Sequence, residues 1–283
     1  MTIVDGNALA NEIRDKLTAS LSALVVKSGI EPCAAIIQIT TDPSASLYTR
    51  RLQRTLTSAG IAVRVIEMAD DTRVDVAVAK IRDLGEDPAV HAIQIQTPLP
   101  GHIPLATLTE VLNPHKDVDG IHPTNAGLLA QGLPAVVPAT PLGGLHILLH
   151  HEVPLSGARA VVVGRSAPVG RPMALLLLQQ DATVTVCHSR TTSLGDIIRQ
   201  ADIVAVAAGR PGLVTADMIR TGAAVIDFGT NVVGGKLVGD VDPAAADRAG
   251  LFTPVPGGTG PVTNAMLLHN VLALYKHFLE EAP

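Results

Sequence analysis

A glycine-rich turn near the middle of this 283-residue chain has the residue types and spacing of a phosphate-binding loop. Gly164 follows the apolar run 160–163 and permits a tight turn, and Gly170 lets the next helix pack close to that strand. Arg165 and Ser166 lie between the two glycines, where the start of a helix presents free N–H groups to a pyrophosphate. Such turns also occur as plain connections, but the strand–turn–helix order favours a dinucleotide site.

The residues after the next apolar run indicate which dinucleotide this is. That run ends in Cys187-His188-Ser189-Arg190, about 20 residues beyond the turn, where NAD enzymes usually carry an acid for the ribose 2′-hydroxyl. Ser189 and Arg190, together with Arg165, offer a hydroxyl and two guanidinium groups instead, which suit a 2′-phosphate. The sequence therefore favours NADP, and the alternative is a solvated pair of arginines on a loop.

Other polar residues could bind a substrate or a metal. Asp119 precedes Gly120, and such an Asp-Gly pair commonly forms a turn. Gln96 closes a strand and could line a pocket or be satisfied by the protein itself. His146 and His150 have helical i,i+4 spacing, but neither an H-E-x-x-H order nor a third ligand accompanies them, so we expect no metal.

Alternating strands and helices are expected to position these groups. The sequence predicts helices over residues 8–25, 46–59, 74–84, 103–112, 142–151, 169–179, 193–199 and 262–276, and strands over 34–39, 62–67, 92–96, 160–163, 182–187, 203–207 and 224–228. This alternation predicts an α/β fold with parallel sheets covered on both faces. A Pro-rich segment over 133–141 is predicted to be extended chain between two such α/β domains.

The composition excludes several classes of protein. Hydrophobic residues make up 47% and charged residues 17%, which supports a buried core. No apolar run reaches the ~18 residues that a membrane helix needs. A net charge of −5 without a long basic run, and the lack of Trp, argue against a nucleic-acid partner. With no secretory signal and two distant cysteines, we expect free thiols and a cytoplasmic location.

Several motifs resemble, in the same order, those of the methylenetetrahydrofolate dehydrogenase/methenyltetrahydrofolate cyclohydrolase family. They are Gln96-Thr97-Pro98-Leu99-Pro100, Lys116-Asp117-Val118-Asp119-Gly120-Ile121-His122-Pro123-Thr124-Asn125, Pro138-Ala139-Thr140-Pro141, Gly164-Arg165-Ser166 and Pro254-Val255-Pro256-Gly257-Gly258-Thr259-Gly260-Pro261. The resemblance implies a folate-binding α/β catalytic domain over 1–140, completed by a C-terminal helix at 261–283, and a Rossmann-like NADP-binding domain with a parallel sheet over 141–260. It also implies a homodimer.

The resemblance further implies an activity and a set of site residues. The activity is NADP-dependent oxidation of 5,10-methylenetetrahydrofolate to 5,10-methenyltetrahydrofolate, followed by hydrolysis to 10-formyltetrahydrofolate. The implied catalytic residues are Tyr48, Gln96 and Asp119, with Tyr48 beside the folate, Gln96 lining its pocket and Asp119 binding the pterin. Pro256, Gly257 and Gly258 shape the pocket wall, and the implied cofactor residues are Gly164, Arg165, Ser166, Gly170, Ser189 and Arg190.

The resemblance breaks down on the helix that carries Tyr48. The family has a Lys four residues after this Tyr and a Ser three residues before it, and here these positions are Leu52 and Ala45. A family Gly before this helix is Thr40 here, and Thr97 interrupts the usual apolar Gln-x-Pro-Leu-Pro. The chemistry of the pocket is therefore expected to differ.

These changes affect the two reactions differently. Oxidation of an N–CH2–N bridge needs orientation rather than a proton carrier, whereas hydrolysis needs general acid–base work. Leu52 cannot do that work, and Arg51 stays protonated and is a poor base. We therefore expect a dehydrogenase with weak or absent cyclohydrolase activity. The alternatives are a bifunctional enzyme whose water is held by Tyr48 and Gln96, and a catalytically silent NADP- or folate-binding paralogue.

Overall fold

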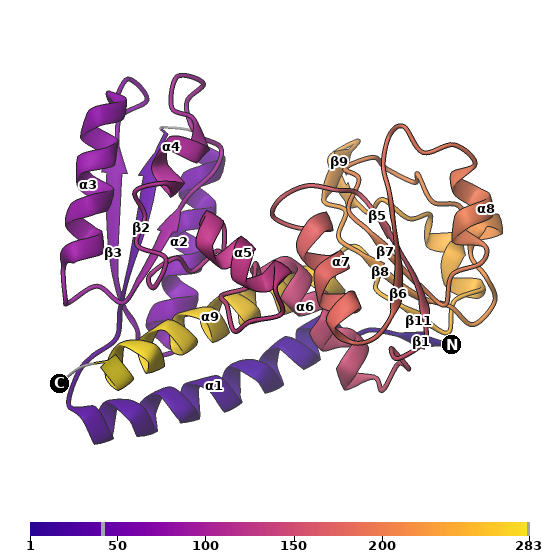
Figure 1. Cartoon of the computed structure of the whole chain (residues 1–283), viewed down its shortest axis with the longest axis horizontal. Coiled ribbons are helices and arrows are strands. Elements are labelled where there is room, and N and C mark those ends of the chain that lie inside the picture. Colours follow the sequence, from indigo (N-terminus) through magenta and orange to yellow (C-terminus); the bar gives the residue numbers. More distant parts are fainter. Residues whose placement is uncertain (41–42, 282–283) are drawn as a thin grey trace. The chain divides into compact units, whose positions relative to one another are not determined.

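The computed structural model describes residues 1–40 and 43–281, which form two compact α/β units (Figure 1). Unit 1 comprises Met1–Glu12 and Val137–Met266, and unit 2 comprises Ile13–Val136 and Leu267–Pro283. Helices α1 (Gly6–Ser28) and α9 (Thr259–Glu281) each contribute residues to both units. The predicted fold class, a two-domain α/β protein with parallel sheets, is confirmed.

Unit 1 is built on a six-stranded parallel sheet in the order β1-β11-β8-β7-β5-β6. Its strands are β1 (Thr2–Ile3), β5 (Arg159–Val163), β6 (Thr183–Cys187), β7 (Ile203–Val206), β8 (Ala224–Asp227) and β11 (Leu251–Phe252). The sequence analysis assigned residues 1–140 to the folate domain, whereas the structure groups the first twelve with unit 1, because Thr2 pairs with Leu251.

Helices cover both faces of the unit 1 sheet, as expected for parallel strands that are mostly apolar. One face packs against α8 (Leu194–Ile198) and the 3-10 helices η1 (Ala216–Met218) and η2 (Pro243–Asp247). The helices α6 (Ala139–His150) and α7 (Gly170–Gln179) lie against the other face, where Gly144 closely approaches the ring of Phe228. An antiparallel hairpin, β9 (Asn231–Val233) with β10 (Lys236–Val238), follows β8.

Unit 2 is built on a three-stranded parallel sheet in the order β3-β2-β4, whose strands are β2 (Cys33–Ile39), β3 (Ala62–Met68) and β4 (Ala92–Ile95). The segment after α4 (Leu105–Thr109) extends this sheet by one parallel bridge, between Ile93 and Asp117. One face of the sheet carries Ile37 and Ile93 and packs against Ile81 of α3 (Val74–Glu86).

Helix α2 (Pro43–Ser58) packs against β3 and β2 in unit 2. Its buried side chains fall four, three and four residues apart, which is the spacing of one helix face. They are Ala45, Thr49, Leu52 and Leu56.

Most predicted elements are present, with differences where proline and glycine act. Helix α6 begins at Ala139, inside the predicted extended segment, because Pro141 stands in the first turn, where a helix needs no N–H. The predicted helix 103–112 shortens to α4 after Pro104, and α5 (Pro123–Ala130) was not predicted. Within the described ranges, no helix combines the length and apolar character needed to cross a bilayer.

Candidate functional site

In unit 1, the turn between β5 and α7 can be built only with glycine at two places. Gly164 has φ +126, and a Cβ there would lie 2.1 Å from the carbonyl oxygen of Ala207. A Cβ on Gly170 would lie 2.3 Å from the carbonyl oxygen of Gly164. The Ser166 hydroxyl accepts a hydrogen bond from the Gly170 N–H at 3.3 Å, which closes the turn on the start of α7. Strand, turn and helix therefore form a cradle of bare backbone that fits a pyrophosphate.

The residues predicted to bind the 2′-phosphate follow the carboxyl ends of two neighbouring strands of the unit 1 sheet. Val163 of β5 pairs with Cys187 of β6, so Arg165 and the Ser189-Arg190 pair begin just beyond adjacent parallel strands. All three side chains are exposed, and none of the ion pairs among the described residues includes either arginine. Their positive charge is therefore available to a ligand.

A buried carboxylate that the sequence analysis missed holds the loop beside this turn. Asp240 is fully buried and accepts hydrogen bonds from the backbone N–H groups of Ala208, Gly209 and Arg210 at 2.6, 2.8 and 2.8 Å. The Asn231 amide donates a fourth bond at 2.8 Å. These three loop residues directly follow Ala207, the residue that Gly164 approaches, so Asp240 fixes the backbone next to the nucleotide turn.

Asp227, at the end of β8, holds the backbone around Asp240 in place. It accepts hydrogen bonds from the N–H groups of Gly229, Asp240 and Val241 at 2.7, 3.1 and 2.9 Å. Burial raises the pKa of Asp227 to about 6, the nearby Asp240 adds to this, and the three N–H donors oppose it. Glycine is required at position 239, since a Cβ on Gly239 would lie 1.9 Å from a carboxylate oxygen of Asp227.

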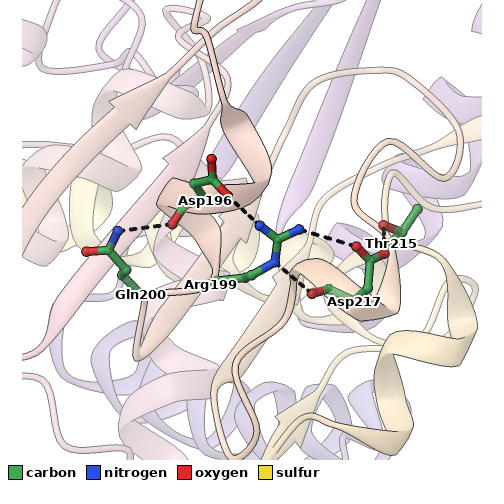
Figure 2. Close-up of polar contacts among 5 residues, drawn as sticks. All are labelled: Asp196, Arg199, Gln200, Thr215 and Asp217. Carbon is green, nitrogen blue, oxygen red and sulfur yellow. Dashed lines mark hydrogen bonds and ion pairs between the residues drawn. The ribbon is translucent and has the colours of Figure 1, made fainter.

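An exposed ion-pair network joins α8 to η1, as Figure 2 shows. The Arg199 guanidinium donates to Asp196 on α8 at 2.5 Å and to the carboxylate and carbonyl oxygens of Asp217 on η1 at 3.4 and 3.1 Å. Thr215 donates to the same Asp217 carboxylate at 2.5 Å. Exposed pairs of this kind typically contribute about 0–1 kcal/mol, so we assign the network to local order rather than to chemistry.

In unit 2, three buried glutamines share one face of the sheet. Ile36 pairs with Gln94, so Gln38, Gln94 and Gln96 project to the same side of β2 and β4. The Gln38 amide donates to the Ser46 hydroxyl of α2 at 2.9 Å. The Gln96 amide donates to the Thr97 carbonyl oxygen at 2.9 Å, so the protein satisfies at least part of this side chain, as the sequence analysis allowed. A buried polar patch thus faces α2.

Several buried oxygen atoms near this patch lack a hydrogen-bond partner among the described residues. They are Oε1 of Gln38, Oε1 of Gln94 and Oγ1 of Thr49. An unsatisfied buried acceptor costs about 1–3 kcal/mol, and a ligand with several N–H groups would remove that cost. The patch therefore fits an aminopterin ring better than an apolar ligand.

Asp119 lies at the edge of this patch. The backbone of Val118 donates to the Ile93 carbonyl oxygen at 3.2 Å, which places Asp119 beside the end of β4. Burial raises the pKa of Asp119 to about 7, Asp117 raises it further, and a hydrogen bond from Gln94 lowers it. Gly120 has φ +62, so the turn role and the ligand role are compatible at this position. Sequence reasoning missed both Gln94 and Asp117.

The helix that carries Tyr48 presents an apolar face where the family resemblance implies a lysine. Leu52 and Ala45 are 4% and 3% exposed on the buried face of α2, the side that meets Gln38 through Ser46. The side chain of Tyr48 lies outside the part of the chain that the structure describes, so its predicted place beside the folate remains a prediction.

Pro256, Gly257 and Gly258 belong to unit 1, where they pack against the start of α1. The Gly6 N–H donates to the Gly257 carbonyl oxygen at 2.9 Å, and a Cβ on Gly6 would lie 1.8 Å from the Gly258 carbonyl oxygen. Gly257 has φ +102. Close backbone packing therefore explains the glycines by itself, and their role as a pocket wall remains a prediction.

Comparisons with known proteins match segments in both units of the chain. Residues 4–119 match the catalytic domain, and residues 138–279 the NAD(P)-binding domain, of tetrahydrofolate dehydrogenase/cyclohydrolase. The chain is 52% identical to the "Bifunctional protein FolD" of Chloroflexus aurantiacus over 272 residues, which is 95% of each chain.

Two solved structures share the whole fold. The bifunctional FolD methylenetetrahydrofolate dehydrogenase/cyclohydrolase of Campylobacter jejuni superposes with a TM-score of 0.96 at 41% identity, covering 98% of this chain and 99% of the other. The Trypanosoma brucei methylenetetrahydrofolate dehydrogenase-cyclohydrolase, solved with NADP cofactor and an inhibitor, gives a TM-score of 0.93 at 36% identity and 99% coverage of both chains. The chain therefore belongs to the tetrahydrofolate dehydrogenase/cyclohydrolase family of enzymes.

Proposed function

We propose that this enzyme oxidises 5,10-methylenetetrahydrofolate to 5,10-methenyltetrahydrofolate with NADP⁺ and hydrolyses the product only weakly. The preference for NADP⁺ rests on the residues that follow the carboxyl ends of β5 and β6. The glycine cradle of Gly164 and Gly170 lies there together with exposed Arg165, Ser189 and Arg190. No acidic residue stands at the end of β6. The relative from Trypanosoma brucei, solved with NADP, supports the same choice.

The residues of unit 1 would bind and orient the cofactor. The cradle at Gly164 and the start of α7 would receive the pyrophosphate, and Arg165, Ser189 and Arg190 would bind the 2′-phosphate through charge-assisted hydrogen bonds. Asp240 would hold the adjoining loop at Ala208 in place. When bound, the nicotinamide supplies the acceptor for the hydride that leaves the substrate.

The residues of unit 2 would orient the folate. Asp119 would accept N–H groups of the pterin, and the buried oxygens of Gln38 and Gln94 offer further acceptors nearby. In the oxidation, the two ring nitrogens carry the positive charge of the product, so the protein needs to supply orientation and a dry pocket rather than a base. The apolar Leu52 and Ala45 are compatible with this task.

Hydrolysis of the methenyl product needs a group that activates water, and α2 does not provide the family's lysine. Leu52 is apolar and buried, and Arg51 is exposed and carries a guanidinium, which is a poor base. For this reason we expect methenyltetrahydrofolate to be released faster than it is hydrolysed.

A second candidate, a fully bifunctional enzyme, is favoured by one observation on Asp119. Burial raises the pKa of this carboxyl to about 7, and a group with such a pKa exchanges protons readily at neutral pH. The bifunctional name of the Chloroflexus aurantiacus relative points the same way. In this alternative, Asp119 or a water held by Tyr48 and Gln96 would replace the lysine.

One assay separates these candidates from a silent paralogue. The enzyme is mixed with 5,10-methylenetetrahydrofolate and either NADP⁺ or NAD⁺, and the absorbance of the methenyl product is followed as it forms and decays. We expect formation with NADP⁺ and decay close to the buffer rate. Decay well above the buffer rate would favour the bifunctional enzyme, and failure to form the product with either cofactor would contradict enzymatic function.

We further propose that the enzyme is a homodimer that works in the cytoplasm. The family resemblance supports the dimer, and the two free, buried cysteines, Cys33 and Cys187, suit a reducing compartment. Sedimentation velocity at micromolar concentration tests the dimer, and a single species of monomer mass would contradict it.

A further inference from the structure

Unit 2 carries a group of three side chains that could hold a metal ion, none of which belongs to the polar patch. They are His115, on the loop after α4, and His277 and Glu281, one helical turn apart near the end of α9. Their ligand atoms all lie within 4.8 Å of one another. The His277 and His115 ring nitrogens are 2.8 Å apart, and the same His277 nitrogen is 3.3 Å from a carboxylate oxygen of Glu281. Two imidazoles and a carboxylate therefore converge on one point at the protein surface.

The backbone on both sides of this group is held firmly. The Asn113 carboxamide oxygen accepts a hydrogen bond from the His115 N–H at 2.9 Å, and Lys116 donates through Nζ to the Asp87 carbonyl oxygen at 2.7 Å. On α9, the Asn270 amide donates to the Val118 carbonyl oxygen at 2.9 Å, which joins the helix directly to the loop. The three ligands are thus positioned by elements that are already tied together.

We propose that His115, His277 and Glu281 form a zinc site that links the end of α9 to the loop leading into Asp117 and Asp119. Two histidines and a carboxylate are a donor set that zinc uses at sites where water takes the fourth position. Imidazole nitrogen selects zinc and similar transition metals, whereas magnesium and calcium prefer oxygen donors. The donor set therefore favours zinc or a similar transition metal over magnesium and calcium.

The change in geometry that zinc requires is small. The His115 and His277 rings lie within 24° of parallel with centroids 4.8 Å apart, and their nitrogens now share a proton in a hydrogen bond. Zinc–nitrogen bonds of about 2.0–2.1 Å at tetrahedral angles place two such nitrogens about 3.4 Å apart. Rotation of side chains that are 40% and 62% exposed, His277 and Glu281, accommodates this change without moving the backbone.

A second histidine group in unit 1 provides a matched control. His146 and His150 on α6 have the same helical spacing as His277 and Glu281, and His151 follows them. Their ring centroids lie 6.5 Å and 5.0 Å apart, from His146 to His150 and from His150 to His151. Among the described residues, no carboxylate joins them in a three-ligand group. We therefore expect this group to bind zinc more weakly.

The test is a zinc titration of the full chain, prepared without a polyhistidine tag and stripped of metal by a chelator. Isothermal titration calorimetry should find one site tighter than the rest. His277→Gln and Glu281→Gln should each weaken that site at least about tenfold, since even partners outside the ligand shell commonly cost 10–100-fold. His150→Gln should leave it unchanged. Because all of these side chains are on the surface, circular dichroism should show native folding in every variant.

Hydrogen exchange tests the link to the loop. Zinc should slow amide exchange over residues 113–121 in the wild type and in His150→Gln, but not in His277→Gln. The proposal is overturned if the tightest site is lost with His150→Gln and kept with His277→Gln, or if magnesium binds at the site as tightly as zinc. Tight zinc binding that leaves exchange over 113–121 unchanged would overturn the link.

Discussion

Restoring a lysine on α2 is the most direct test of the proposed division of activities. The double change Leu52→Lys with Ala45→Ser places at both positions the residues that the family resemblance implies. Both side chains lie on the buried face of α2, 4% and 3% exposed, next to the polar patch of Gln38. A lysine there would stand where it can activate water, so hydrolysis should rise by ~10²-fold while oxidation changes much less.

Burying a lysine side chain at position 52 also lowers the stability of the folded protein. To act near pH 7, the ammonium pKa must fall from about 10.4 to about 7, and at 1.36 kcal/mol per unit this lowers the free energy of unfolding by about 4 kcal/mol at neutral pH. The sign follows because the unfolded chain binds the proton more tightly than the folded one. Total stabilities are about 5–15 kcal/mol, so the variant should still fold but melt earlier.

Leu56→Lys is the matched control, because Leu56 is 2% exposed on the same face of α2, one turn farther from Tyr48. It should destabilise the protein to a similar extent without any gain in hydrolysis. The assay compares accumulation of methenyltetrahydrofolate with formation of the 10-formyl product, and chemical denaturation measures stability. An equal gain from Leu56→Lys, or wild-type hydrolysis far above the buffer rate, would refute the reasoning.

Three further variants test the site. Arg165→Ala should cost roughly 1.5–3 kcal/mol of binding with NADP, the range for a hydrogen bond to a charged group, and leave NAD turnover unchanged in steady-state kinetics. Because the pterin needs the ionised form of Asp119, whose pKa is about 7, folate affinity should rise about tenfold between pH 6 and 8. A calorimetric pH series should lose that dependence in Asp119→Asn, without loss of NADP affinity. Asp240→Asn places an amide against three N–H donors, so KM for NADP should rise about tenfold in kinetics while folate binding is retained.

The elements of the fold were largely predictable because their periodicities are strong. Strands such as β2 and β5 are continuous apolar runs, and Gly164 and Gly170 mark a turn that only glycine can form. Helix α5 was missed because it is short and contains Gly127, and its start is capped by His122, whose ring accepts a hydrogen bond from the Thr124 N–H. Local sequence does not reveal such a cap.

The supporting residues of the site were not predictable for a different reason. Asp240 accepts hydrogen bonds from loop residues 30 to 32 positions away. Gln94 on β4 forms a hydrogen bond with Asp119, which belongs to a later segment of the chain. Only the fold brings these groups together, so spacing along the chain carries no sign of them. The histidine pair weighed from sequence, on α6, had helical spacing, whereas His115 reaches His277 across 162 positions.

The pairing of β1 with β11 has a consequence for the order in which the protein folds during synthesis. Thr2 cannot pair with Leu251 until Leu251 has been synthesised. At about 5–20 residues per second, the ribosome needs roughly 12–50 s to make the intervening chain. The sheet of unit 2, complete by Ile95, can form long before that. The first strand to leave the ribosome is therefore the last edge of the unit 1 sheet to find its partner, and chaperones that shield exposed strand edges have their longest opportunity to act there.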